Sequence, residues 1–496
     1  MDGNRGNVPR APRIFRRYLL DHQNLSRRRF RSISFRFLRN QAQWELTSAF
    51  SAGYDTRIYP TSLKRSTKMP PKRKKTAPAP RNPRVSPPRP EKDQAIQVIN
   101  FGDVYFEHPR PDVHVARILI SNASWIDTTE GAVVVDTLLH PALGRKMLEE
   151  IRKTAGQVKY IVYTHGHLDH VGGASAFLED APKVIAHRYV TDRFEKYRIL
   201  SEHRERIAQM QFNFAFHADR AASFVNPTQV YDETLTFKLG DKTFELNHAR
   251  AETDDATWVF VPEIETAFVG DLIIAGFPNI GNPFKPTRFA LPWARALEAV
   301  RVKNPKMLVA HGGHAVYQGD DVKELLDVTI EAIHSIHDQV VDFINKDVPL
   351  DEMIHMVNLP EHLKDHRYLR FLYSRPEFAV QNIYRWYHGY FDHNPAHLLP
   401  RPEREVNNEI FRLIGDREAI LKRSRRLLAR GKGQLALQVL DVLLNHDPND
   451  VAARKLHIKI LGILCEQDYC LMSRNTWVYF MEKDKKLLKI ESRHVE

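Results

Sequence analysis

Three histidines and an aspartate crowd into the stretch YTHGHLDHVGG, residues 163–173. As free side chains, His165, His167, Asp169 and His170 would gain little from adjacency, and the alternative interpretation is a solvated histidine-rich turn. Imidazole nitrogens and carboxylate oxygens are ligands that zinc accepts in proteins. His165 and His167 are expected to face the same side of the loop, and Asp169 and His170 a neighbouring spot. The stretch therefore predicts a metal site that could serve two ions.

The candidate metal-binding stretch lies between a predicted strand and a predicted helix. The run VKYIVYT (158–164) is rich in β-branched and aromatic residues, which is typical of a buried strand. VGGASAFLED (171–180) predicts the helix that follows. Elsewhere strands alternate with helices, and hairpins such as the one around Gly240-Asp241 interrupt the alternation. This pattern predicts a layered α/β body of mixed sheets covered by helices, and after about residue 320 the pattern is helical.

A metal site needs further ligands from elsewhere in the chain. Glu252 precedes the predicted strand ATWVFV, Asp271 ends the predicted strand TAFVGD, and His311 ends the predicted strand MLVAH. Polar side chains at such strand ends are partly buried and need partners. With the loop they supply four histidines and three carboxylates, enough to hold two metal ions and leave room for water. Asp136, at the end of GAVVVD, is expected either to orient a ligand histidine or to cap the next helix.

The motif H-x-H-x-D-H, followed by a lone aspartate and a late histidine, resembles the metallo-β-lactamase superfamily. Glu252 stands where many members have a histidine, and in this the chain is similar to the alkyl sulfatase branch. The stretches YRWYHGYFDHNPAHLLP (384–400) and RNTWVYFM (474–481) resemble parts of that branch's dimerisation domain. The resemblance implies an α/β fold: a metallo-β-lactamase αββα sandwich followed by an all-helical dimerisation domain.

The resemblance also implies ligands, a cofactor and a catalytic residue. The expected ligands of two Zn²⁺ ions per subunit are His165, His167, Asp169, His170, Glu252, Asp271 and His311. Asp169 is the expected catalytic residue, because it is placed to touch both the metal and the attacking water. The substrate-binding candidates are Asn279, Asn282 and Arg288, in the segment 272–293 where we expect sulfate contacts. His314 stands where the branch commonly has proline and is a candidate spare ligand.

The favoured function is hydrolysis of a sulfuric ester, an alkyl sulfate, by water that a dinuclear zinc site activates. A carboxylic ester, a lactone or a thioester could react at the same metal site. A third interpretation is a catalytically silent scaffold that kept the fold, although every expected metal position carries a competent ligand. Nucleic-acid processing is disfavoured, because the body of the chain is not basic.

The net charge of +12 is distributed unevenly along the chain. Residues 1–90 carry 22 Lys and Arg against 4 Asp and Glu, a net of +18, which leaves −6 for the remainder. The Arg- and Ser-rich run 12–41 is typical of a mitochondrial transit peptide, and the prolines of 69–90 predict an unfolded linker. We expect three parts: a basic, Pro-rich, disordered extension (1–93), a metallo-β-lactamase-like catalytic domain (94–320) and a helical dimerisation domain (321–486).

Composition and pattern also bear on partners and compartment. Two cysteines exclude a disulfide framework, and the sequence has no apolar run of the length that predicts a transmembrane helix. The expected partners are a small-molecule ester substrate and a second copy of the chain, because a helical hairpin such as 428–464 cannot bury both faces alone. We expect no nucleic acid and no stable membrane insertion. A mitochondrial or cytoplasmic location is favoured over a nuclear one, despite the basic cluster Lys72-Arg73-Lys74-Lys75.

Overall fold

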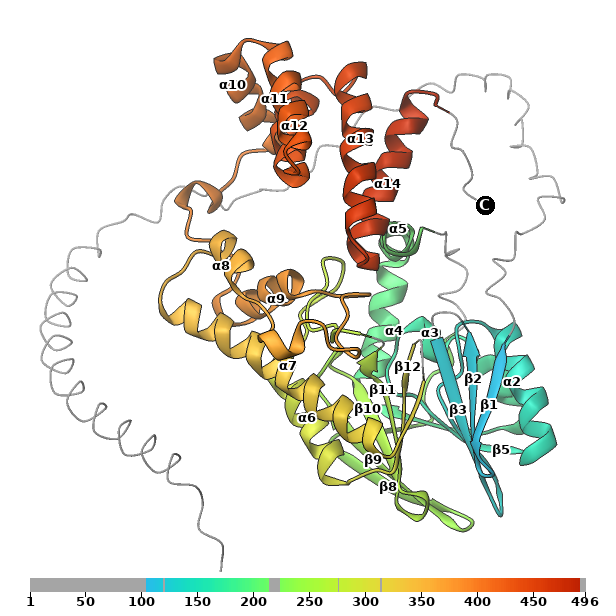
Figure 1. Ribbon diagram of the computed structural model, residues 1–496. Helices are drawn as coiled ribbons and strands as arrows, with labels where there is room; N and C mark the ends of the chain where they lie inside the picture. Colours follow the sequence, from blue (N-terminus) through green and yellow to red (C-terminus); the bar gives the residue numbers. More distant parts are fainter. Residues whose placement is uncertain (1–103, 119–120, 214–223, 275, 313–314, 491–496) are drawn as a thin grey trace, which may run out of the picture. The chain divides into compact units, whose positions relative to one another are not determined.

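The computed structural model describes residues 104–118, 121–213, 224–274, 276–312 and 315–490 (Figure 1). The predicted extension 1–93 and the candidate ligand His314 lie outside the described residues. Among the described helices, none combines the length and the apolar composition that crossing a bilayer requires.

Two mixed β-sheets lie in the first part of the described chain. The first sheet has the strand order β1-β2-β3-β4-β5-β6-β7, and the second β13-β12-β11-β10-β9-β8. The first sheet comprises β1 Tyr105–Arg110, β2 Val113–Ile118, β3 Ser121–Thr128, β4 Gly131–Val135, β5 Val158–Val162, β6 Lys183–His187 and β7 Gln229–Tyr231. The second comprises β8 Thr234–Leu239, β9 Lys242–Ala249, β10 Ala256–Val261, β11 Thr266–Ile274, β12 Met307–His311 and β13 Val316–Gln318. Strands β4 to β7 run parallel, as do β11 and β12.

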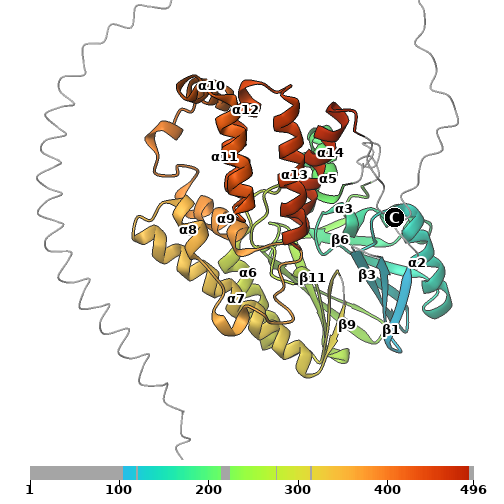
Figure 2. The same ribbon diagram turned by 45° about the horizontal axis from the view of Figure 1, so that its top comes forward.

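Helices cover the outer faces of both sheets and make up the C-terminal part (Figures 1 and 2). The helices between and after the strands are α2 Pro141–Thr154, α3 Leu168–Val171, α4 Tyr189–Ile199, α5 Ser201–Phe212, α6 Ala290–Val302, α7 Asp320–Asn345, α8 Leu350–Met356 and α9 Pro376–His388. The C-terminal helices are α10 Glu403–Ile414, α11 Arg417–Ala429, α12 Gly433–His446, α13 Val451–Gln467 and α14 Leu471–Leu487.

Apolar side chains form three layers around the sheets. Successive residues of β4 face opposite sides, as a strand requires. Val133 packs between the sheets with Phe268 of β11, whereas Val134 packs against Met147 of α2 on the outer face. The outer face of the second sheet packs against α6, α7, α8 and α9. The predicted αββα sandwich is therefore confirmed.

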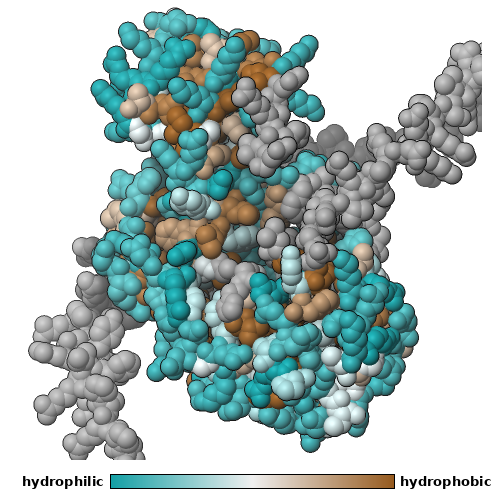
Figure 3. All heavy atoms as spheres, turned by 45° about the vertical axis from the view of Figure 1, so that its right-hand side comes forward, coloured by the Kyte–Doolittle hydropathy of each residue, from teal (hydrophilic) through white to brown (hydrophobic). Residues whose placement is uncertain are grey.

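The C-terminal helices have a core of their own. Leu421, Leu440 and Ile460, from α11, α12 and α13, belong to one buried cluster. The predicted hairpin within 428–464 is the pair α12 and α13, and Asp450 caps α13 by accepting a hydrogen bond from the Ala453 amide. Helix α14 packs along α13 and also contacts α5 (Figure 2). Apolar side chains reach the surface in this helical part (Figure 3).

The structure corrects two predicted elements near the site. In place of the helix predicted over 171–180, the chain forms a 3₁₀ helix, Ala174–Asp180, and the four-residue α3 lies before it, within the histidine motif. The chain packs closely between these two helices, because a Cβ on Gly173 would lie 1.9 Å from the Thr137 carbonyl oxygen. Asp271 does not end its strand: β11 continues to Ile274, and its register with β12 shifts on both sides of Gly270. Such a bulge re-aims side chains, here that of Asp271.

Candidate metal centre

The histidine motif follows the carboxyl end of β5, the end where open parallel sheets commonly bind ligands. Two buried carboxylates fix this loop. Asp136 accepts hydrogen bonds from the Thr164 amide at 2.7 Å and from the Thr164 hydroxyl at 2.6 Å. Asp255 accepts from the Gly166 amide at 3.0 Å and from Arg193 at 2.8 Å. The loop is thus held at its start and at its middle by residues distant in sequence.

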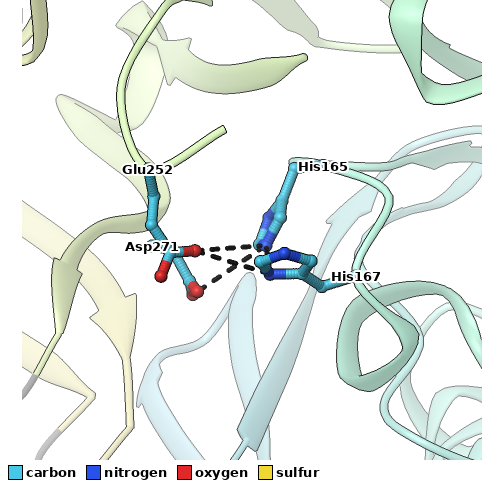
Figure 4. A group of neighbouring side chains, drawn as sticks. All are labelled: His165, His167, Glu252 and Asp271. Atoms are coloured by element: carbon cyan, nitrogen blue, oxygen red, sulfur yellow. Dashed lines mark hydrogen bonds and ion pairs between the residues drawn. The ribbon is translucent and has the colours of Figure 1, made fainter. Parts of the chain in front are cut away.

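A first group of potential ligands consists of His165, His167, Glu252 and Asp271, whose ligand atoms all lie within 4.8 Å of one another. Figure 4 shows the two imidazoles of the loop facing the two carboxylates. His165 Nε2 lies 3.8 Å from Glu252 Oε2 and 3.6 Å from Asp271 Oδ2. His167 Nδ1 lies 3.4 Å from Glu252 Oε2. This set of nitrogens and oxygens is suited to a cation.

A second group, Asp169, His170 and His311, has its ligand atoms within the same 4.8 Å limit. Asp169 Oδ2 lies 3.7 Å from His170 Nε2 and 3.5 Å from His311 Nε2. Asp271 connects this group to the first, because its Oδ1 lies 3.2 Å from His170 Nε2 while its Oδ2 faces His165. All seven predicted ligands therefore converge in two adjacent groups.

Asp136 orients one of these histidines. Its Oδ2 lies 2.7 Å from His170 Nδ1, so the ring nitrogen that remains for a ligand is Nε2. The alternative prediction, that Asp136 caps the next helix, is wrong. The N-cap of α2 is His140, whose side chain accepts the Ala142 amide.

The three substrate-binding candidates lie in different surroundings. Asn279 is buried, and its amide nitrogen donates to Glu252 Oε1. Arg288 donates to the Glu252 carbonyl, and its Nη2 lies 3.2 Å from Glu252 Oε1. Asn282 is buried beside Met472, with its Nδ2 3.6 Å from the sulfur. Two of the three therefore contact the candidate ligand Glu252, and substrate contact by any of them stays a prediction.

A cavity of about 310 Å³ opens over both groups of potential ligands. It is lined on one side by His167, Asp169, Glu252, Asp271 and His311. The rest of its wall comes largely from α5, from residues 372–373 and from the start of α14, and is mostly apolar. This is the concave, largely apolar type of site that binds small molecules.

The polar residues of this wall that were not predicted from the sequence are Tyr197, Arg204, Gln211, Lys285 and Tyr373. Lys285 falls in the segment 272–293 where sulfate contacts were expected, so its charge was the available signal. Burial lowers the pKa of Lys285 to about 8, and Arg288 adds to the effect while Glu252 opposes it. Arg204 and Tyr373 come from segments without any motif, so only the packing of the chain brings them to the cavity.

Burial and neighbouring charges perturb the potential ligands strongly. Burial, together with His170, lowers the pKa of His165 to about 4. Burial raises the pKa of Glu252 to about 7; Arg288 opposes this shift and Asp271 adds to it. Desolvated titratable groups that perturb one another in a cavity are typical of functional sites.

The residues present fit a metal ion. His170 Nε2, Glu252 Oε2 and Asp271 Oδ1 are buried and have no hydrogen-bond partner among the described residues. Buried polar atoms are almost always hydrogen-bonded in folded proteins, so three convergent atoms that accept or donate no hydrogen bond are suited to bind a cation. The imidazole and carboxylate atoms available are those that zinc binds.

Comparisons with known proteins agree with this geometry. Residues 116–329 match the family model of the metallo-beta-lactamase superfamily, and residues 349–486 match that of alkyl sulfatase dimerisation. The chain is 27% identical over 359 residues to a linear primary-alkylsulfatase of Pseudomonas sp., covering 67% of this chain and 68% of that protein. It is 23% identical over 390 residues to the alkyl/aryl-sulfatase BDS1 of Saccharomyces cerevisiae, covering 72% of this chain and 60% of that protein.

A solved structure gives the same fold. The stereoselective inverting sec-alkylsulfatase Pisa1 from Pseudomonas sp. is 22% identical with a TM-score of 0.70, covering 78% of this chain and 66% of that one. The part of the chain that matches these relatives corresponds to between 60% and 68% of their length. The two family models match in order along the chain, so residues 116–329 form a metallo-β-lactamase domain and residues 349–486 an alkyl sulfatase dimerisation domain.

Proposed function

We propose that this protein hydrolyses sulfuric esters of small amphiphiles, with two zinc ions bound by the seven predicted ligands. The observation that carries the proposal is the convergence of these seven side chains in two adjacent groups, five members of which line one end of a mostly apolar cavity. The relatives named alkylsulfatases support the choice of a sulfuric ester over other esters.

Each residue of the site has a distinct part in this proposal. His165, His167 and Glu252 would hold one ion, and Asp169, His170 and His311 the other. Asp271 contacts His165 of the first group and His170 of the second. Zinc supplies Lewis-acid activation of water and neutralises charge on the ester. Asp169 lines the cavity beside His170 and His311, so its carboxylate can orient the attacking water and accept its proton.

Positively charged residues assist at the same end of the cavity. Lys285 lines the wall shared by Asp169 and Glu252, where its ammonium group can neutralise charge on the sulfate that leaves. Arg288 and Asn279 hold Glu252 in position through its carbonyl and its Oε1.

Metal quantification on the purified protein, followed by turnover of a medium-chain alkyl sulfate, tests this function. We expect two equivalents of zinc and release of inorganic sulfate. A panel containing a lactone, a carboxylic ester and a thioester accompanies the alkyl sulfate. If the protein hydrolyses the lactone, the carboxylic ester or the thioester and releases no sulfate from the alkyl sulfate, its substrate belongs to that other ester class. Metal-loaded protein inert to the whole panel would instead favour a scaffold.

We also propose that the chain forms a homodimer through α10. Val406, Ile410 and Leu413 lie one to two turns apart on this helix and are 45%, 37% and 89% exposed. An apolar stripe of this kind, in a domain whose model is named for dimerisation, supports a second copy as its partner. Light scattering is expected to give a dimer, and Leu413→Glu with Ile410→Glu a monomer. Val302→Glu, at an 83% exposed position of α6, is the control that stays dimeric.

A further inference from the structure

Arg204 brings a positive charge to the cavity, and none of the described carboxylates forms an ion pair with it. It lies on α5 and lines the cavity together with Ile207, Ala208 and Phe212 of the same helix. Its Nη1 is buried without a hydrogen-bond partner, and no described carboxylate lies within ion-pair distance of it. Arginine stays charged in proteins, so this is a partly desolvated positive charge without an anionic partner in the described part of the chain.

The other arginines of α4 and α5 differ from Arg204 in that each forms an ion pair with a carboxylate. Arg193 pairs with Asp254 and Asp255, Arg198 with Glu195, and Arg206 with Glu202. These three have carboxylate partners on the surface or beside the loop. Among the described residues of the two helices, only the arginine that faces the cavity lacks one.

Aromatic rings hold Arg204 in place. Its guanidinium carbon lies 4.8 Å from the centre of the Tyr197 ring and 5.6 Å from that of Phe224. Phe224 in turn stacks on Phe194, with ring centres 4.4 Å apart and an interplanar angle of 10°. Stacking on aromatic faces suits guanidinium and leaves its N–H groups free to bind an anion. A side chain fixed in this way loses little entropy when it binds a ligand.

Arg204 and Lys285 occupy different electrostatic surroundings in the one cavity. The carboxylates of Glu252 and Asp169 act on the pKa of Lys285. Burial lowers the pKa of Arg204, and the only group that opposes this is Tyr197. Among the described residues, no ion pair joins Arg204 to a potential metal ligand, and the wall contributed by Ile207, Leu372 and Leu471 is apolar.

We propose that the cavity takes a ligand with two anionic ends: a sulfate at the metal centre and a second anion, a carboxylate or a sulfonate, at Arg204, joined by an apolar chain. The sulfate end rests on the proposed function, whereas the end at Arg204 rests only on the cavity and its unpaired guanidinium. A charge-assisted hydrogen bond in a desolvated pocket discriminates strongly between a ligand with the second anion and one without it.

Binding of unreactive sulfonates tests this directly. Linear alkane disulfonates and monosulfonates of six to twelve carbons are titrated calorimetrically into the metal-loaded protein and its variants. We expect Arg204→Leu to weaken the best disulfonate by about tenfold and to leave the monosulfonates unchanged. Arg206→Leu, an exposed and paired position on the same helix, is expected to change neither. If Arg204→Leu weakens neither class, or both equally, the second anion site does not exist.

Two further measurements keep the outcomes separate. Arg204→Lys retains the charge and the stem, so it is expected to keep part of the disulfonate preference even if Arg204→Leu folds poorly. Sulfate release from an alkyl sulfate is followed on the same preparations. Binding that depends on Arg204 without any sulfate release would overturn the proposed function and leave the anion site standing. Sulfate release with no Arg204-dependent binding would support the proposed function and overturn the anion site at Arg204.

Discussion

Asp136 Oδ2 lies 2.7 Å from Nδ1 of His170, and both side chains are buried. The same carboxylate accepts two hydrogen bonds from Thr164, so its position is fixed by the start of the histidine loop. On its other side His170 presents Nε2 to Asp271 Oδ1 at 3.2 Å. Asp136 thus determines the ring orientation of a residue that belongs to the second group of potential ligands, without belonging to that group itself.

Replacing this acceptor is expected to weaken metal binding. In Asp136→Asn, an amide N–H group must face Thr164 or His170, which both donate to the carboxylate. We expect the metal affinity or the activity to fall by about 10- to 100-fold. Metal titration with a competing chelator measures the affinity. Asp342→Asn, on the exposed side of α7, is the control and is expected to match the unmodified protein. Unchanged affinity in Asp136→Asn would contradict a positioning role.

Removing one histidine of the first group is expected to remove metal and activity together. His167→Ala deletes a nitrogen that lies 3.4 Å from Glu252 Oε2 and leaves that buried oxygen without a cation. We expect the bound metal to drop below two equivalents and the activity to fall at least about 100-fold. Elemental analysis and a turnover assay measure both. His203→Ala, at an exposed position of α5, is the matched control. Full metal content in His167→Ala would show that the ligand set is wrong.

The bulge that aims Asp271 depends on a glycine. Gly270 has a φ of +49°, and a Cβ there would lie 2.7 Å from the Thr164 side chain. Gly270→Ala is therefore expected to lower the free energy of unfolding by more than Gly415→Ala, which has a φ of +65° with open space around it. Both variants carry the strain of a positive φ, about 1–2 kcal/mol. The difference between their losses therefore measures the contact with Thr164. Chemical denaturation measures the two variants. Equal losses would mean that the contact with Thr164 is not restrictive.

The stability of the C-terminal helices is expected to depend on pH because of Asp441. Burial on α12 raises the pKa of Asp441 to about 6, with His457 opposing and Glu403 adding to the shift. The unfolded chain has the ordinary value near 3.9, so the folded state binds the proton more tightly and loses stability as the pH rises between these values. Asp441→Asn is expected to raise the melting temperature more at pH 8 than at pH 5. Asp365→Asn, at an exposed turn, should show no such difference. A shift for Asp441→Asn that is the same at both pH values would contradict this.

The local pattern was sufficient for the histidine loop and for most strands. β5, Val158–Val162, lies within the predicted run 158–164, and the hairpin β8–β9 turns at Gly240-Asp241 as predicted. These features depend on neighbours within a few residues: the alternation of apolar side chains, turn chemistry and the spacing of imidazoles. The ligand types at Glu252, Asp271 and His311 were also visible, because polar residues beside buried strands are unusual.

The packing of distant segments decided the rest. The bulge that aims Asp271 comes from the pairing of β11 with β12, and no residue of β11 alone specifies that register. The close approach of the Leu139 and Thr137 carbonyls to Gly172 and Gly173, where a larger residue would clash, also depends on distant segments. Arg204, Tyr373 and Leu471 reach one cavity only because α5, a loop and α14 meet in space. Sequence spacing fixes chemistry over a few residues, whereas convergence over hundreds of residues is set by which apolar faces bury one another.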